Sequence, residues 1–242
     1  MKTTANKIEM YEIINSEHRN PHNILGIHEI IIDGEKAVAI RAFIPQASSI
    51  KVIEEKNTSL KYDMEKIHEA GFFEIVFLNK KEKFKYKLEI TAYNNNQWIT
   101  YDPYSFNPII SDFDKYLFNQ GTHYSIYEKL GSHPMTIEGV KGTLFAVWAP
   151  NAKRVSIIGN FNDWDGRRHQ MRCLGDSGIW ELFIPGIIEG DLYKYEIKTK
   201  ENYILKKTDP YGYYMELRPN TASIVYDIGK YKWNDEKWME ER

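Results

Sequence analysis

The segment from Gly159 to Arg168, GNFNDWDGRR, places a tryptophan among residues that favour turns. Gly, Asn and Asp supply left-handed backbone or local side-chain hydrogen bonds, and such turns lie at the surface. An indole in a turn can cover a flat, partly apolar ligand, such as the C–H face of a pyranose ring. Asn160, Asn162 and Lys194 could bond the hydroxyl rim if the strand with Lys194 lies beside the turn. These residues predict sugar stacking at Trp164.

The sequence contains no recognisable catalytic motif. There is no G-x-S-x-G, no phosphate-binding loop and no Cys-x-x-Cys, and the carboxylates are scattered without an evident facing pair. His18 and His22 are four residues apart, but Pro21 breaks the helix that would align them as metal ligands. Asp163 and Asp165 are interpreted as turn-forming residues. We therefore predict no catalytic residue, no metal site and no cofactor.

The chain is an internal duplication with a period near 105 residues. The matches run in order with small drifts: Leu25–His28 with Leu130–His133, Phe43 with Trp148, Gly71 with Gly178, Phe73 with Trp180, Tyr86-Lys87 with Tyr195-Glu196, and Asp102–Tyr104 with Asp209–Tyr211. A period this long indicates duplicated domains, because solenoid repeats span only about 20–50 residues. The two histidines after Leu-Gly are predicted to serve that turn, and Trp148 and Trp180 to be core or interface aromatics.

The duplication provides a control for Trp164. The competing interpretation is that its indole folds back and caps the end of the domain. After Ile53, however, the first copy reads EEKNTSLKY where the second has GNFNDWDGRR, and no aromatic stands at the matching point because Tyr62 comes too late. A core tryptophan would need a counterpart, so the difference favours a binding role specific to the second copy.

Each copy predicts a set of short β-strands. The expected strands are 37–43, 50–53, 72–78 and 84–93 in the first copy, and 143–148, 155–158, 180–184, 193–197 and 222–226 in the second. Apolar and polar residues alternate in several of them, which is typical of half-buried antiparallel strands. Short strands with a turn signal every 8–12 residues indicate a sandwich. The predicted fold class is therefore all-β, with two tandem β-sandwich domains.

Helix is expected only at the edges of these domains. Residues 5–17 carry an apolar face and end before Asn20-Pro21. Residues 112–119 follow Ser111, with Asp114 completing a capping box and Gly121 ending the helix. The expected division is 1–110 for the first domain, 111–124 for an inter-domain helix and linker, 125–228 for the second domain and 229–242 for a tail.

The composition narrows the class of protein. The 242 residues suit two domains of about 100 residues each. A net charge of −2 lacks the basic excess of a nucleic-acid binder. A single cysteine, Cys173, allows no intramolecular disulfide and is predicted to be a small buried residue. No signal peptide and no membrane-length apolar run is expected, so we predict a cytoplasmic location without membrane contact.

Six motifs of the second copy resemble the second N-terminal domain of bacterial 1,4-α-glucan (glycogen) branching enzymes: YEKLGSHP, FAVWAPNAKRVSIIGNFNDWDGRRHQMR, GIWELFIPG, YKYEI, KKTDPYG and RPNTASIV. Four motifs of the first copy resemble the first N-terminal domain: NPHNILGIH, RAFIPQA, MEKIHEAGFFE and DPYSF. Together they cover essentially the whole chain. The resemblance implies two immunoglobulin-like sandwiches, the second a family 48 carbohydrate-binding module like those of isoamylases and AMP-activated kinase β subunits.

The resemblance also implies particular site residues. In glycogen-binding members of the module, the tryptophan of the FN-x-W turn and a lysine of the Y-K-aromatic strand contact glucan, which implies Trp164 and Lys194. A further aromatic on the next hairpin implies Tyr203. A terminal contact made by Asn in those members falls on Ser223 here.

The family's reaction cleaves an α-1,4 bond and moves the released chain to a 6-hydroxyl, using an Asp nucleophile and a Glu acid/base on a (β/α)8 barrel. A barrel needs about 250 residues, which this chain lacks. The resemblance therefore implies a non-catalytic part of the enzyme whose partners are α-glucan (glycogen or maltooligosaccharide) and the catalytic barrel. Trp233, Trp238 and Met239 on the charged tail indicate a missing partner surface.

Two alternatives stay open. Both domains could be structural, bracing the barrel and setting the length of the transferred chain without a ligand of their own. The chain could also be a stand-alone glycan-binding adaptor that recruits a partner through its tail.

Overall fold

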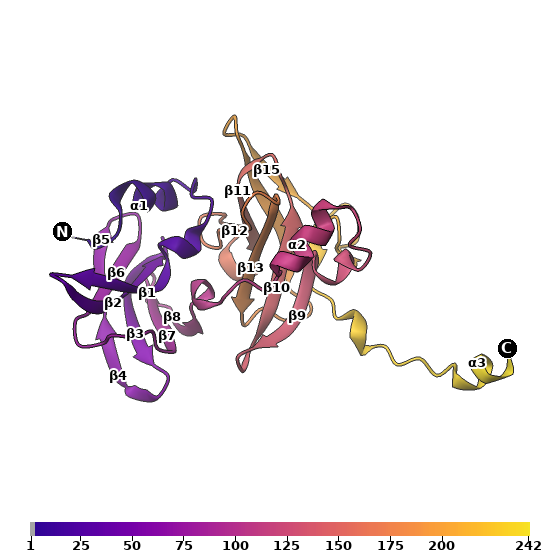
Figure 1. Ribbon diagram of the computed structural model, residues 1–242, viewed down its shortest axis with the longest axis horizontal. Coiled ribbons are helices and arrows are strands. Elements are labelled where there is room, and N and C mark those ends of the chain that lie inside the picture. Colours follow the sequence, from indigo (N-terminus) through magenta and orange to yellow (C-terminus); the bar gives the residue numbers. More distant parts are fainter. Residues whose placement is uncertain (1–2) are drawn as a thin grey trace.

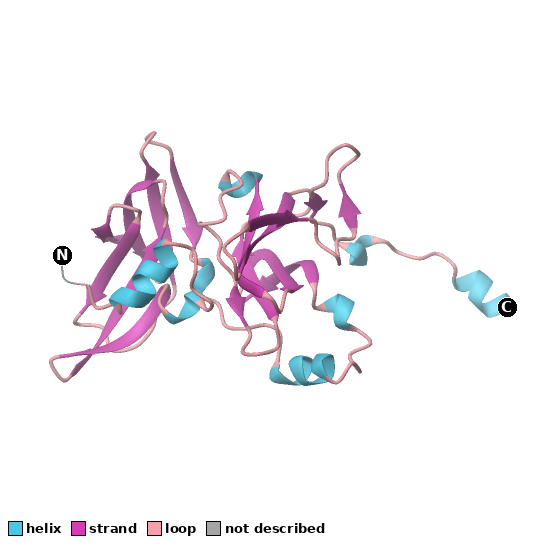
Figure 2. Ribbon diagram, turned by 90° about the horizontal axis from the view of Figure 1, so that it is seen from above, coloured by secondary structure: helices cyan, strands magenta, loops and turns pink. Residues whose placement is uncertain are grey.

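A computed structural model describes residues 3–242 as a mostly β molecule with two sandwich-like domains side by side and an extended tail (Figures 1 and 2). All strand pairs in its four sheets are antiparallel. Within these residues, no helix is long and apolar enough to cross a membrane. The predicted all-β fold class with two tandem sandwiches is confirmed.

The first domain contains two four-stranded sheets, with strand orders β1-β2-β6-β5 and β4-β3-β7-β8. Its elements are α1 (Lys7–Ile14), η1 (Pro21–Asn23), β1 (Gly26–Ile32), β2 (Glu35–Phe43), β3 (Ala47–Glu54), β4 (Asn57–Asp63), β5 (Glu65–His68), β6 (Phe72–Phe77), β7 (Tyr86–Ala92), β8 (Gln97–Tyr101) and η2 (Pro103–Ser105). Alternating burial along β7 shows one face on the core and one toward solvent.

The second domain repeats this plan. One sheet has the order β12-β13-β10-β9, and the other has β11-β14-β17-β16 with β15 paired to β14. Its elements are α2 (Asp112–Asn119), η3 (Ile126–Glu128), β9 (Gly131–Ile137), β10 (Val140–Trp148), β11 (Ala152–Gly159), η4 (Asn160–Asn162), β12 (Arg172–Cys173), β13 (Ile179–Pro185), β14 (Leu192–Thr199), β15 (Ile204–Lys207), β16 (Tyr214–Met215) and β17 (Ser223–Ile224). The tail carries η5 (Ile228–Lys230) and α3 (Glu236–Glu241).

The predicted helices form, one as expected and one shorter. Helix α2 has the predicted bounds, and Ser111 and Asp114 form the reciprocal capping box. Gly121 follows with a left-handed φ of 70°, which suits a helix end. Helix α1 is shorter than 5–17, because Asn6 caps its start and Ser16 adopts a left-handed φ of 53° after its end. The expected last strand, 222–226, narrows to the two residues of β17.

Equivalent tyrosine–aspartate pairs fix the true alignment of the two copies. The Tyr86 hydroxyl donates to Asp102 at 2.6 Å, and the Tyr193 hydroxyl donates to Asp209 at 2.6 Å. The predicted match of Tyr86-Lys87 with Tyr195-Glu196 is therefore wrong by two residues. The sequence left two candidates, because the second copy has tyrosines at both 193 and 195. Both of them bond Asp209, with the Tyr195 hydroxyl at 3.2 Å.

The strand register confirms the corrected match. Ile53 pairs with Lys87 between β3 and β7, and Ile158 pairs with Lys194 between β11 and β14. Lys87 is therefore the counterpart of Lys194 in the first domain. This equivalence gives the first domain a lysine at the predicted site position but no tryptophan.

The paired histidines serve their turns, as predicted. The ring of His28 donates to the carbonyl of Leu25 at 2.9 Å, and the ring of His133 donates to that of Leu130 at 3.0 Å. Burial lowers the pKa of both imidazoles. Each histidine therefore closes a turn in its neutral form.

One hydrophobic cluster runs across both domains and joins them. It contains Phe43 and Phe72 of the first domain together with Met171 and Trp180 of the second. Cys173 is buried in the same cluster, as predicted. Trp180 is therefore a core residue, whereas Trp148 is 52% exposed, so a core role is excluded for it.

Hydrogen bonds fix the boundary between the domains. The backbone N–H of Gln170 donates to the Tyr104 hydroxyl at 3.0 Å, and that of Cys173 donates to the Arg19 carbonyl at 2.9 Å. These backbone N–H groups of the second domain are buried and find their acceptors in the first domain. The two sandwiches therefore pack directly against each other.

Candidate functional site

The turn between Gly159 and Arg168 is held together by one buried amide. The Asn162 side chain accepts the Gly159 N–H at 2.9 Å, donates to the Ile157 carbonyl at 2.8 Å and donates to Nδ1 of His169 at 2.8 Å. Its exposed fraction is 0%. Asn162 therefore has no free surface for a sugar, contrary to the prediction, because the turn itself uses its bonding capacity.

His169 accepts the hydrogen bond from the Asn162 amide through a neutral imidazole. Burial, together with the positive charge of Arg168, lowers the pKa of its imidazole to about 3. Phe161 lies beside it with ring centroids 5.7 Å apart, and Phe161 packs against the cluster that joins the domains. Phe161 is thus the turn's inward-facing aromatic.

Trp164 occupies a different position from Phe161. It is partly exposed and belongs to none of the hydrophobic clusters found in residues 3–242. Its N–H donates to the Gly159 carbonyl at 3.0 Å, and its indole N–H donates to Oδ1 of Asn160 at 2.9 Å. The predicted polar neighbour Asn160 is therefore in place, and it fixes the direction of the indole.

The backbone at Trp164 is unusual for a bulky residue. Asp163 and Trp164 have φ angles of 55° and 58°, in the left-handed region. That region costs roughly 1–2 kcal/mol for a residue with a Cβ, and Gly or Asn would adopt it more cheaply. Such strain persists where the surrounding structure enforces it, and it gathers at functional positions. The observed strain marks Trp164 as a candidate binding residue.

Two glycines let the turn lie close to strand β14. A Cβ on Gly159 would come within 2.2 Å of the Leu192 carbonyl oxygen, and one on Gly166 within 1.9 Å of Oε1 of Glu196. Glu196 is itself held by a two-nitrogen ion pair with Arg154, at 3.1 Å for each nitrogen. The turn therefore rests on a rigid support.

Lys194 lies beside the turn, which meets the condition set by the sequence. It pairs with Ile158, one residue before the end of β11, and its ammonium donates to the Thr221 hydroxyl at 2.7 Å. Thr221 is exposed and was not predicted, although it falls in the RPNTASIV motif. An ammonium has three donors, so Lys194 keeps capacity for a ligand oxygen.

The structure separates Tyr203 from this group. Tyr203 is 69% exposed at the β14–β15 hairpin, where its carbonyl accepts the N–H of Thr199 at 2.9 Å. Thr199 is five residues along β14 from Lys194, or about 17 Å at the usual rise of a strand. Tyr203 and Lys194 therefore lie toward opposite ends of β14, a separation that a chain of several sugar units spans more readily than one ring.

Ser223, which the resemblance places at a terminal polar contact, is fully buried. Its hydroxyl accepts the N–H of Asp209 at 3.0 Å, inside the tyrosine–aspartate corner. It therefore belongs to the frame of the domain, and Thr221 supplies the exposed hydroxyl of this segment instead.

The charges of the turn are balanced. Arg168 pairs with Asp163 at 2.8 Å, and Arg167 pairs with Asp165 at 2.6 Å. Among residues 3–242, no group of three or more His, Cys, Asp or Glu side chains is placed to hold a metal ion. A partly exposed indole on a charge-balanced turn, with the Lys194 ammonium and the Thr221 hydroxyl on neighbouring segments, suits an uncharged polyhydroxylated ligand.

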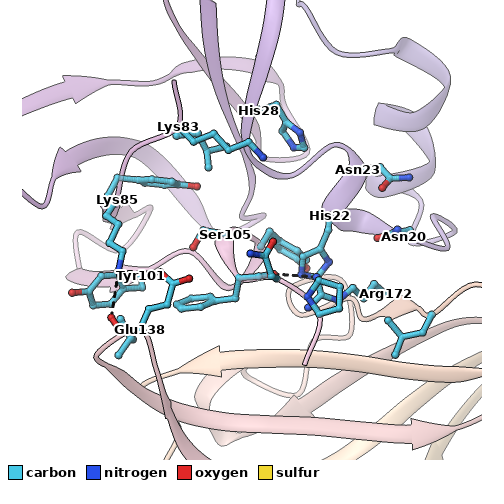
Figure 3. Close-up of a pocket in the computed structure, with 18 of the residues that line it drawn as sticks. Asn20, His22, Asn23, His28, Lys83, Lys85, Tyr101, Ser105, Glu138 and Arg172 are labelled. Atoms are coloured by element: carbon cyan, nitrogen blue, oxygen red, sulfur yellow. Dashed lines mark hydrogen bonds and ion pairs between the residues drawn. The ribbon is translucent and has the colours of Figure 1, made fainter. Parts of the chain in front are cut away.

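Two hollows lie between the domains, and neither is lined by Trp164 or Lys194. The larger has a volume of about 550 Å³, with His28 and Lys83 from the first domain and Arg172 from the second (Figure 3). The smaller, of about 290 Å³, lies behind the turn at Phe161 and His169. The candidate site at Trp164 and Lys194 is therefore separate from both hollows.

Comparison with known proteins places both domains in families. Residues 6–104 match the family described as "alpha-1,4-glucan branching enzyme GlgB, N-terminal domain", and residues 129–212 match "Carbohydrate-binding module 48 (Isoamylase N-terminal domain)". Among solved structures, a pullulanase from Anoxybacillus sp. LM18-11 is 17% identical over 86% of this chain and 28% of its own, with a TM-score of 0.37.

Curated relatives match nearly the whole chain. The "1,4-alpha-glucan branching enzyme GlgB" of Thermosynechococcus vestitus is 47% identical over 240 residues, which is 99% of this chain and 31% of that protein. The protein of the same description from Synechocystis sp. is 47% identical over 244 residues, with 100% and 31% covered. The chain thus spans about a third of the length of these relatives.

Proposed function

This chain belongs to the N-terminal region of the 1,4-alpha-glucan branching enzyme family, with that family's N-terminal domain followed by a carbohydrate-binding module of family 48, and we propose that it binds α-glucan at Trp164. The observation that carries this proposal is the indole itself. It is partly exposed, strained into the left-handed region and directed by its bond to Asn160. A preset aromatic surface loses little freedom when a ligand binds.

In this proposal, the indole covers the C–H face of one glucose ring and Lys194 bonds a hydroxyl at its rim. The Thr221 hydroxyl accepts a hydrogen bond from the Lys194 ammonium at 2.7 Å. The same hydroxyl can donate a hydrogen bond to a sugar oxygen or accept one from a sugar hydroxyl. The ligand is glycogen or a maltooligosaccharide, a chain that extends over the surface beyond one ring. Tyr203 contacts such a chain only when it is long enough to reach the β14–β15 hairpin.

We further propose that the chain holds glucan for a catalytic domain in the remaining two thirds of the protein and transfers nothing by itself. The relatives are about three times as long as this chain, which leaves ample length for a catalytic barrel. Purified chain incubated with amylose is expected to form no α-1,6 branches. Branches formed by the chain alone would contradict this part of the proposal.

Titration with maltoheptaose tests the binding. The chain has six tryptophans, so wild type and a Trp164→Phe variant are compared to isolate the signal of one indole. We expect a saturable fluorescence change in wild type that is strongly reduced in the variant. No change in wild type would favour purely structural domains, and an equal change in both proteins would place the site elsewhere.

A further inference from the structure

The duplication extends to the helices that precede each sandwich. Helices α1 and α2 begin at positions 105 residues apart, and so do the short helices η1 and η3. Each helix has a capping side chain at its start, from Asn6 in one copy and Ser111 in the other. Each repeat is therefore a helix, a short turn and a sandwich, and the surfaces of the two repeats can be compared position by position.

The helix end of the first repeat packs against the domain that follows it. Ile13 of α1 is fully buried, and Phe43 at the end of β2 is 3% exposed within the cluster that joins the domains. The carbonyl of Ser16 accepts from Arg154 at 3.4 Å, and that of Arg19 accepts from Cys173 at 2.9 Å. This end of the first sandwich is thus an established docking surface for the next domain.

The same end of the second repeat is aromatic and more exposed, with Trp148 packed edge-on against Phe118 of α2 at a ring-centroid distance of 5.8 Å. Trp148, the counterpart of Phe43, is 52% exposed, and Tyr124, the counterpart of Arg19, is 88% exposed. Tyr127, the counterpart of His22, is also exposed at its side chain, and its carbonyl accepts from the Tyr213 hydroxyl at 2.7 Å. Helix α2 has no fully buried residue, whereas α1 buries Met10 and Ile13.

This aromatic end comprises Tyr124, Tyr127, Trp148 and Tyr213. Figure 1 shows helix α2 on the far side of the second sandwich from the first domain. The indole N–H of Trp148 is already satisfied by the Ser177 carbonyl at 3.2 Å, so covering the ring leaves no donor unpaired. Aromatic residues are enriched in the cores of protein interfaces, and three of these four, Tyr124, Tyr127 and Trp148, are exposed here.

We propose that the aromatic end docks the segment that follows these two domains in the longer relatives. The first repeat supplies the argument, because it uses the equivalent end to hold the next domain of the chain. The relatives supply the occupant, since about two thirds of their length lies outside the match and the first matched family is described as an N-terminal domain. This inference goes beyond glucan binding and does not depend on Trp164.

Hydroxyl-radical footprinting tests the proposal in two proteins. One is this chain alone, and the other is a graft in which the chain replaces the matched 240 residues of the Thermosynechococcus vestitus enzyme. Oxidation at Trp148 and Tyr124 is expected to fall at least roughly five-fold in the graft, because an interface core excludes water. Tyr93, an exposed aromatic of the first domain, serves as the control and is expected to react equally in both.

A second measurement does not depend on the graft. Hydrogen exchange in the natural Thermosynechococcus vestitus enzyme and in its matched 240-residue fragment compares the segments aligned with residues 111–127 and 148–151. Slower exchange there in the intact enzyme supports the proposal. Equal oxidation at Trp148 and Tyr124 in both proteins, or equal exchange in this second pair, overturns it. Protection that appears in the isolated chain with rising concentration assigns the surface to a second copy, and protection only on adding maltoheptaose assigns it to glucan.

Discussion

Between equivalent pairs of residues, the first domain has eleven residues, 52–62, and the second has thirteen, 157–169. The second domain therefore inserts two residues, and its segment from Gly159 to Arg168 (the insertion) forms a turn where the first domain continues into strand β4. The flanking geometry is otherwise shared. Lys51 pairs with Asp63 in the first domain, and its counterpart Ser156 bridges to Gln170 in the second. The equivalent hairpin therefore forms a strand in one copy and a turn with an added tryptophan in the other.

The comparison also separates the roles of the two lysines. Lys87 of the first domain lies over the Tyr101 ring at 4.7 Å, a cation–π contact within its own domain. Lys194 instead donates to an exposed threonine next to the turn. Lys87 thus contacts an aromatic ring of its own domain, whereas Lys194 lies where a ligand could reach it. The difference supports the proposal that the insertion, rather than the shared sandwich, binds the ligand.

The largest effect is expected from removing the amide that holds the insertion. Asn162→Ala leaves the Gly159 N–H and the Ile157 carbonyl without partners, so we expect it to cost about 2–4 kcal/mol and to weaken glucan binding. Asn57→Ala, at the matching first-domain hairpin, is expected to change stability by less than about 0.5 kcal/mol because its side chain is exposed. Urea unfolding measures both, and equal losses would show that the insertion has no special support.

The second-largest effect is expected from acid, which should reduce the contribution of His169 to the free energy of unfolding. Folded His169 has a pKa of about 3, whereas the unfolded residue takes up a proton near its ordinary value of 6.5. The unfolded state therefore binds more protons between these values, so this contribution is full above pH 6.5 and is lost as pH falls toward 3. The advantage of wild type over His169→Phe, which cannot titrate, should shrink from pH 7 to pH 4 in urea unfolding. A constant difference would mean that the imidazole is not held neutral.

A smaller effect is expected from the paired lysines. Lys194→Met removes one charged hydrogen bond at the rim of the site and should weaken maltoheptaose binding about three- to ten-fold. Lys87→Met, its structural counterpart, should leave the affinity unchanged. Calorimetric titration measures both variants, and a loss of affinity with Lys87→Met would show that the first domain contributes to the site.

Much of the frame follows from local residue patterns. The capping box at Ser111 and Asp114 and the histidine turns at His28 and His133 depend on contacts within a few residues. Several strands also show a local alternation of apolar and polar residues, which a sequence displays. The insertion and its partly exposed tryptophan were likewise visible as a difference between the copies. These features were predictable because local chemistry determines them.

The remaining features depend on contacts between distant segments. Asn162 looked like a free polar residue of a turn, but its amide is buried by bonds to Ile157 and His169. Trp148 was predicted to be a core or interface residue, and its half-exposed position excludes the core alternative, whereas its first-domain counterpart Phe43 is covered by another domain. Thr221 became part of the site only when strand pairing brought it to Lys194. No periodicity or spacing reports such contacts.

Retention on a glycogen affinity gel tests the role of the insertion most directly. Trp164→Ala is compared with Trp233→Ala, which removes an indole that is 75% exposed on the tail. We expect Trp164→Ala to lose at least about ten-fold in apparent affinity, or roughly 1.4 kcal/mol, while its unfolding free energy stays within about 1 kcal/mol of wild type. Trp233→Ala should migrate like wild type. Equal retention of wild type and a folded Trp164→Ala protein would contradict the proposal that this turn binds glucan.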